Sequence, residues 1–327
     1  MNGWQTMAWL KNTLKILPLL LMTSLSSAQD YPSRTVRLVV PYAAGGAPDV
    51  LARLLAQRLM ENLNQSFVVE NKPGAGGIGA SELVAKAPND GYTLLIPDVP
   101  QLALNPFLFS KLPYDPVKDF APVSIVAMTP MFIAVHPASN LNSLPALLNL
   151  ARSKPGQLSY GSAGIGSLHH IAMESLKAVA GVDITHVPYK GTGQSVPAFI
   201  AGDVQIVVST LAAIEPFIRS GKARLLAGTP SNRTPRTPDI PAIAETYPGF
   251  HFAGEIGVVA PAGTPPAIIS RLSQEIQKAT RHPDMLKRLG ELGAIAVGST
   301  PEAYVDNIKR SLDIYARSVK ASGIKAE

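Results

Sequence analysis

The sequence predicts an α/β protein with two domains. Short apolar runs rich in β-branched residues alternate with stretches of helical period, which is typical of parallel strands joined by helices. A unit of strand, glycine-rich turn and helix recurs in both halves of the chain. The 327 residues are enough for two domains, and a hydrophobic content of 46% suits a substantial core.

The first such units lie before residue 97. We expect strands at residues 36–41, 67–70 and 92–96, and helices at residues 48–63 and 78–86. Leu51 and Leu55 fall on one face of the first helix. Pro48 suits its first turn, because the missing N–H costs nothing there.

The same pattern returns after residue 157. We expect strands at residues 158–160, 184–187, 206–209 and 225–227, and a helix at residues 168–180. Two later helices are announced by Thr264-Pro265 and Thr300-Pro301, each a cap followed by a proline-compatible turn. No loose linker separates the two halves, so the chain should cross between domains at strands, as in hinged binding proteins.

The first 28 residues have the pattern of a cleavable leader. Lys11 and Lys15 precede an apolar run at residues 16–25, and the small residues 26–28 provide a cleavage point. The run is short for a membrane span, which needs about 20 apolar residues. A buried N-terminal helix is the alternative. We therefore predict an exported, periplasmic protein.

Composition excludes several classes of function. The chain has no Cys, so disulfides, thiolate catalysis and cysteine metal sites are absent. Loss of the leader lowers the net charge from +6 to +4, and the remaining charge is spread along the chain. Nucleic-acid binding would need a basic stripe with aromatics. A mild preference for small anions fits better.

Three glycine-rich turns, at residues 43–46, 74–77 and 161–167, each lie between a strand and a helix. Backbone N–H groups at the start of a helix form an anion site. A glycine can also be present only to turn the chain, so one such loop decides little. Three of them favour a carboxylate or phosphate site.

Two enzymatic alternatives are weaker. Residues 74–79 fit the GxGxxG dinucleotide fingerprint, but residues 71–73 separate strand from turn, and an exported protein is remote from nicotinamide cofactors. Ser162 and Ser167 do not lie in GxSxG. His169 and His170 are adjacent, so on a helix they cannot share a metal. We expect no cofactor, no metal and no catalytic residue.

Several long strings together resemble the Bug family, the extracytoplasmic binding receptors of tripartite tricarboxylate transport systems. They include VPYAAGGAPDVLAR at residues 40–53, VVENKPGAGGIGA at 68–80, GSAGIGSLHHIAMESLK at 161–177 and VPYKGTGQSVPAFIAGDV at 187–204. The strings keep their order from about residue 31 to the C-terminus.

The resemblance implies a type II periplasmic binding protein fold, with two α/β domains, a central cleft and hinge crossovers. Residues 29–127 and 253–327 would form domain 1, and residues 128–252 domain 2. The protein would be a monomer that closes on a small carboxylate, such as an amino acid, an aromatic acid or a dicarboxylic acid. It would deliver this ligand to membrane subunits, or act as a sensor without a permease.

The resemblance also implies the ligand contacts. On domain 1 these are Tyr42, Ala43, Gly45, Gly46, Asp98 and Gln101, and on domain 2 they are Ser162, Gly166, Ser167, His170 and Ser209.

Two departures from the family pattern concern specificity. Family members usually carry a small neutral residue at Asp98 and a Trp near residues 254–256, where this chain has Glu255. A carboxylate facing the cleft would repel a dianion. We therefore hypothesise a ligand with one carboxylate and a neutral or cationic part. The alternative is that Asp98 or Glu255 faces solvent or pairs with a basic residue.

Overall fold

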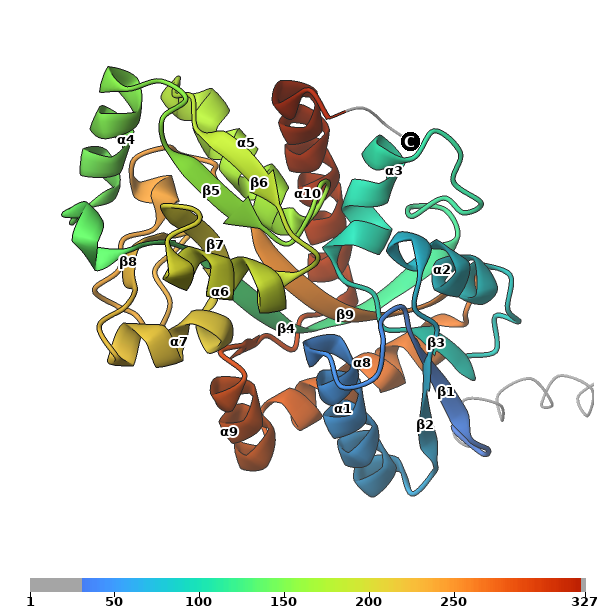
Figure 1. Cartoon of the computed structure of the whole chain (residues 1–327). Helices are drawn as coiled ribbons and strands as arrows, with labels where there is room; N and C mark the ends of the chain where they lie inside the picture. Colours follow the sequence, from blue (N-terminus) through green and yellow to red (C-terminus); the bar gives the residue numbers. More distant parts are fainter. Residues whose placement is uncertain (1–30, 325–327) are drawn as a thin grey trace, which may run out of the picture.

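The computed structural model describes residues 31–324, so the proposed leader lies outside the described residues. Ten strands of the described chain form one hydrogen-bonded sheet, ordered β2-β1-β3-β9-β4-β7-β5-β6, with β8 and the short β10 (Ile295–Ala296) also paired to β4. Figure 1 shows two lobes, with β4 and β9 running between them. No helix within residues 31–324 is long and apolar enough to cross a membrane.

The first lobe contains three parallel strands and four helices. The strands are β1 (Val36–Val40), β2 (Phe67–Asn71) and β3 (Thr93–Leu95). The helices are α1 (Ala47–Leu63), α2 (Ile78–Ala85), α8 (Pro266–Thr280) and α9 (Pro283–Glu291). Leu38 and Leu94 of the strands pack with Leu55 of α1 and Leu272 of α8 in one buried core.

The second lobe repeats this plan. Its strands are β5 (Ser159–Ser162), β6 (Thr185–Pro188), β7 (Ile206–Thr210) and β8 (Arg224–Gly228), and β5 is parallel to both β6 and β7. Its helices are α4 (Leu144–Ser153), α5 (Leu168–Ala180), α6 (Thr192–Ala201) and α7 (Leu211–Arg219).

Two long strands connect the lobes. Strand β4 (Phe120–Val135) pairs with β9 (Ala253–Pro261) as far as Pro130, and with β7 from Met131 onward. Pro130 lies where the partner changes, and its lack of an N–H removes a ladder hydrogen bond there. The predicted fold, with crossings at strands, is confirmed. The domain boundaries remain a proposal.

The lobes also share a core. The π-helix η2 (Pro100–Leu104) and the short α3 (Asn105–Leu108) follow β3 of the first lobe. Ala103 and Leu104 nevertheless pack in the core that contains Tyr160 and Ile171 of the second lobe. The last helix, α10 (Pro301–Ser322), packs against both η2 and α5.

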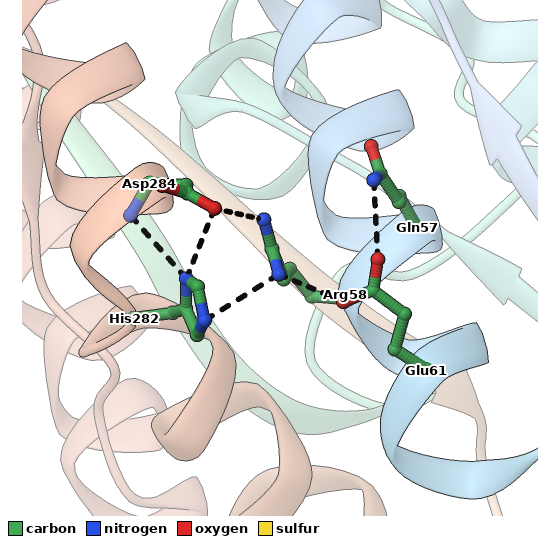
Figure 2. Close-up of polar contacts among 5 residues, drawn as sticks. All are labelled: Gln57, Arg58, Glu61, His282 and Asp284. Carbon is green, nitrogen blue, oxygen red and sulfur yellow. Dashed lines mark hydrogen bonds and ion pairs between the residues drawn. The ribbon is translucent and has the colours of Figure 1, made fainter.

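A charged cluster fastens α9 to α1 on the first lobe (Figure 2). Arg58 donates hydrogen bonds of 2.7 Å to Asp284 and to Glu61, and lies 3.5 Å from Nε2 of His282. Nδ1 of His282 accepts the N–H of Asp284 at the start of α9. The cluster therefore ties helices that are distant in sequence.

Most predicted elements occur within one or two residues of their expected ends. Helix α5 covers residues 168–180 as expected, and Thr300 caps α10 through its hydroxyl. The prediction that Thr264 caps a helix was wrong. Helix α8 begins after Pro265, and the Thr264 hydroxyl donates to the carbonyl of Pro261 instead. Strands β4, β9 and β10 and helices α3, α4, α6, α7 and α9 were not predicted.

Candidate functional site between the lobes

The candidate site begins with the loops that leave the carboxyl ends of β1, β2 and β3. Ligands of open parallel sheets bind beyond these strand ends. In the first loop Ala43, Gly45 and Gly46 are exposed, and Gly46 is the N-cap of α1. Gly45 has φ +86°, which a residue with a side chain adopts only with strain. The loop therefore presents backbone rather than side chains.

Buried groups behind this first loop hold it in place. Asp49 accepts the N–H of Gly45 at 2.9 Å, and Asn71 donates to Asp49 and to the carbonyl of Tyr42. Burial alone would raise the pKa of Asp49, but hydrogen bonds from Arg53, Gly45 and Asn71 lower it. An ionised Asp49 thus secures the loop. The sequence gives a sign of this role, because Asp49 is an acid in the first turn of a helix.

Gln101 joins the three loops of the first lobe. Its Oε1 accepts the N–H of Asp98 at 2.9 Å, and its Nε2 donates to the carbonyl of Gly76 at 2.8 Å. The hydroxyl of Tyr42 lies 3.5 Å from the same amide. A Cβ on Gly77 would lie 2.6 Å from Nε2 of Gln101, so the turn requires glycine. Gln101 is 1% exposed, so its side-chain amide bonds to the loops and does not face solvent.

Asp98 links η2 to the crossing strand β9. Its Oδ1 accepts the N–H groups of Val99 and Glu255, both at 2.7 Å. Burial raises the pKa of Asp98 to about 6, and the nearby Glu255 adds to the rise. The side chain of Glu255 is itself buried, and its Oε1 lies 3.1 Å from Nδ2 of Asn307 on α10 and 3.3 Å from Nε2 of His251. Glu255 is thus held by protein groups.

The second lobe supplies three helix N-termini at one edge of its sheet. Strands β5, β6 and β7 lead through short turns into α5, α6 and α7. Their N-caps are Ser167, Gly191 and Thr210. Each helix start carries unpaired N–H groups and the positive end of a dipole. Together they form an environment that attracts an anion.

Ser162 ends β5 and is completely buried. Its Oγ lies 2.7 Å from Nε2 of His186 on β6, and it also accepts the N–H of Gly164 at 3.1 Å. Pairing of β5 with β6 brings these residues together, because Ser162 is level with Pro188, two residues beyond His186. His186 was not predicted to belong to the site. Its only sequence signal is its position in a strand that should lie beside β5.

His170 and Ser167 shape the rest of this loop. Nδ1 of His170 accepts the N–H of Gly166 at 3.1 Å, and Ser167 caps α5 by accepting the N–H of His170 at 3.3 Å. The rings of His170 and His186 stack with centroids 3.9 Å apart. Burial lowers the pKa of His186 to about 4, helped by His170, and burial also lowers the pKa of His170. Both rings are therefore neutral at pH 7.

Two buried hydroxyls near these helix starts lack a partner within residues 31–324. Ser209, at the end of β7, and Ser195, on α6, are 0% exposed, and neither Oγ makes a hydrogen bond. Buried polar groups are nearly always paired with protein, water or ligand. Both hydroxyls are covered by neighbouring protein atoms, so a ligand reaches them only after those atoms move.

The two sets of loops meet where α3 contacts the loop before α5. A Cβ on Gly166 would lie 3.2 Å from Cδ1 of Leu108, so the loop passes directly over α3. The structure thus brings Gly166, Ser162, Ser167 and His170 into one loop, and joins Tyr42, Asp98 and Gln101 in another network. Ser209 hydrogen-bonds to neither group.

The dinucleotide-like turn at residues 74–77 is in contact with neighbouring protein elements. The described residues contain no group of three or more acidic or histidine side chains that could hold a metal. In the dinucleotide-like turn, the carbonyl of Gly76 accepts hydrogen bonds from both Gln101 and Asn105. The turn is thus packed against η2 and α3.

Two α/β lobes, joined by crossing strands and facing each other through strand-end loops, define a bilobal solute-binding protein. The model of the tripartite tricarboxylate transporter family receptor matches residues 51–317. The chain belongs to this family, and the predicted resemblance to the Bug proteins is confirmed.

Three similar proteins illustrate the relationship. BugT of Bordetella pertussis is 37% identical over 255 residues, which cover 77% of this chain and 78% of BugT. The R. palustris protein Rpa4515 with adipate has 35% identity and a TM-score of 0.77, covering 91% of this chain and all of Rpa4515. MatC of Rhodopseudomonas palustris with bound malate has 31% identity and a TM-score of 0.72, covering 88% of this chain and all of MatC.

Proposed function

We propose that the protein is exported through the leader at residues 1–28 and captures a small carboxylate between its lobes. It then delivers this ligand to membrane subunits of a tripartite tricarboxylate transporter. Residues 29–127 with 253–327 form one domain in this proposal, and residues 128–252 form the other. The mature protein acts as a monomeric receptor without catalytic activity.

The observation that carries this proposal is the second-lobe edge, where α5, α6 and α7 all begin. Partial positive charge at three helix starts stabilises an anion without a basic side chain. When the covering protein atoms move as the lobes close, the unpaired hydroxyls of Ser195 and Ser209 become donors to the carboxylate. Hydrogen bonds to a charged acceptor are about twice as strong as neutral ones.

The first lobe contributes the exposed backbone of Ala43, Gly45 and Gly46. This loop is rigid because Asp49 and Asn71 hold it from behind. A preformed loop loses little entropy when the lobes close on a ligand. In this proposal the second lobe binds the carboxylate, and the first lobe binds the opposite end of the same small molecule.

The nature of the second end of the ligand is decided at Asp98. Adipate and malate, bound by the two relatives, are dicarboxylates, whereas an ionised Asp98 favours a ligand with a neutral or cationic second end. The pKa of about 6 leaves Asp98 mostly ionised at pH 7, although its Oδ1 is already satisfied by two backbone N–H groups. Adipate, malate, succinate and aspartate together distinguish these possibilities.

A thermal-shift screen tests the proposal. Mature protein, refolded to remove retained ligand, is heated with each of these acids and with benzoate and nicotinate. A ligand at a hundred times its Kd adds about 2.7 kcal/mol of stability, which corresponds to a rise in Tm of roughly 5 °C. Preference for aspartate over succinate supports a role for Asp98. Equal affinity for the two contradicts that role, and absence of any shift contradicts the ligand class.

A matched pair of serines tests the location of the site. Ser209 and Ser175 are both buried with an unpaired Oγ, but Ser175 lies on the α5 face that packs toward Phe250 and Phe252. Ser209→Ala should weaken binding of the strongest acid about tenfold through loss of one hydrogen bond to a charge. Ser175→Ala should leave binding unchanged. Equal losses in both variants would place the ligand elsewhere.

A further inference from the structure

Three aromatic rings form a column beneath the loop at residues 162–167. The ring of His186 lies between those of His170 and Tyr160, with centroid distances of 3.9 Å and 4.9 Å and interplanar angles of 10° and 22°. The hydroxyl of Tyr160 donates to Glu174 at 2.6 Å, which fixes the far end of the column. Because another ring packs on each face of His186, its ring cannot turn unless a neighbouring ring also moves.

The column holds the loop at two points. Nε2 of His186 is bonded to the hydroxyl of Ser162, which in turn accepts the N–H of Gly164. Nδ1 of His170 accepts the N–H of Gly166. The N–H groups of Gly164 and Gly166 are therefore already hydrogen-bonded, to Ser162 and to His170.

We propose that His186 is a positioning residue for the ligand: it holds Ser162, and through Ser162 it fixes which N–H groups of the loop face the cleft. This inference rests on the proposed function and names a residue that acts on the site without touching the ligand. It also assigns the buried Ser162 hydroxyl to the loop itself.

The N–H groups that this arrangement leaves for a carboxylate can be named. Within residues 31–324, those of Ile165, Leu168 and His169 have no protein acceptor. Leu168 and His169 open α5, where helix geometry provides no acceptor for them. A shift of Gly164 toward the cleft would change this set of donors.

The column works as a neutral scaffold. Nδ1 of His170 can accept the Gly166 N–H only when this nitrogen carries no proton. The rings of His170 and His186 stack 3.9 Å apart, so a positive charge on one ring disfavours protonation of the other. The charged groups beside the column, Glu174 and Lys177, are paired with each other at 2.9 Å. The loop should keep its geometry across the neutral pH range.

Substitution of His186 tests this inference in the full mature protein. His186→Phe keeps a ring in the column but removes Nε2, whereas His186→Gln keeps a hydrogen-bonding group but removes the ring. His136→Gln, on a histidine at the opposite end of the second-lobe sheet, is the matched control. The readouts are amide hydrogen exchange by NMR in the ligand-free protein and calorimetric affinity for adipate and malate.

In His186→Phe we expect exchange at Gly164 to become at least about tenfold faster and affinity to fall about tenfold, as for one lost hydrogen bond. His186→Gln should lie between this variant and wild type, and the Gly45 amide should not change in either. Unchanged exchange at Gly164 in both variants, or the same change in His136→Gln, would overturn the inference.

Two further readouts keep the test decisive. If His186→Phe fails to fold, long-range proton–nitrogen spectra of the wild type still report on the column, and a proton on Nδ1 of His170 at pH 7 contradicts it. If wild type binds neither adipate nor malate, only the choice of ligand in the proposed function fails. The exchange at Gly164 and Gly166 still decides the role of His186.

Discussion

At the residue scale, side chains behind the loops determine what the loops present. Asp49, Gln101 and His186 each accept or donate hydrogen bonds to loop groups while remaining wholly or partly buried. The exposed parts of the loops are then mostly backbone. This division explains how the proposed site for a charged ligand can exist without a Lys or Arg among its proposed contacts.

Asp98 provides a test of this arrangement through pH. Its folded pKa of about 6 exceeds the ordinary value of 3.8, so the folded state binds a proton between these values that the unfolded state does not. Its stabilising effect is therefore complete below pH 3.8 and is lost as pH rises through 6. Asp98→Asn keeps the acceptor oxygen and removes the buried charge.

Calorimetry should accordingly show that Asp98→Asn is more stable than wild type at pH 8 by about 1 kcal/mol, which raises Tm by roughly 2 °C. The gain should shrink at pH 4.5, where the wild-type carboxyl is already protonated. Asp306→Asn, on an exposed aspartate of α10, is the control and should match wild type. A gain that is larger at pH 4.5 than at pH 8 would contradict the buried charge.

Sequence reasoning at this scale identified the loops but not their supports. The turns at residues 43–46 and 161–167 were recognisable because glycine and serine before a helix have a known use. The role of His186 depends on pairing between β5 and β6, and that of Gln101 on a π-helix packed against two other loops. Neither long-range contact has a local sequence signature.

At the element scale, interior prolines account for three of the missed segments, α6, α7 and β4. Helices α6 and α7 contain Pro197 and Pro216, which interrupt the expected helical pattern. Strand β4 contains Pro122 and Pro130, which argue against a strand in isolation. Tertiary packing overrides these local preferences, whereas α1 and α5 have periodic apolar faces and were predicted nearly to the residue.

Packing of α10 on β9 gives the prediction at this scale. A Cβ on Gly257 would lie 2.6 Å from Cζ of Tyr304, and Tyr304 is fully packed at 2% exposure. Gly257→Ala should therefore destabilise the protein by about 2–3 kcal/mol, as overpacking of a core does. Denaturant unfolding followed by circular dichroism measures the loss.

Gly290 is the matched glycine, since it lies within α9 and a Cβ there would contact nothing within 4 Å. Gly290→Ala should stabilise the protein by about 0.5–1 kcal/mol, because alanine favours the helix. Opposite signs for the two glycine variants are the expected result. Destabilisation by both would mean that α9 packs more tightly than its geometry indicates.

At the scale of the whole molecule, the two lobes are less independent than their separate sheets suggest. Leu104 of η2 is 1% exposed, and it packs in the same core as Ile171 of α5 and Tyr315 of α10. The sequence indicated two lobes and crossing strands, because repeated strand–turn–helix units are visible along a chain. It gave no sign of this shared core, which depends on α10 lying across both lobes.

A shared core predicts one cooperative unfolding transition. Differential scanning calorimetry should give a single peak with equal calorimetric and van't Hoff enthalpies. Leu104→Ala should lower the free energy of unfolding by about 2–4 kcal/mol, as other buried Leu→Ala substitutions do. It should move that single peak to a lower temperature. Two resolved peaks, or a loss confined to one of them, would show that the lobes unfold separately.

The unpaired N–H groups of the loop before α5 have a consequence for how such receptors diverge. A main-chain N–H persists whatever side chain is attached to the same residue, so exchange of neighbouring side chains leaves the carboxylate anchor intact. In the proposed site, point substitutions around Ile165, a residue that is 72% exposed, should therefore change the accepted ligand while the backbone donors remain.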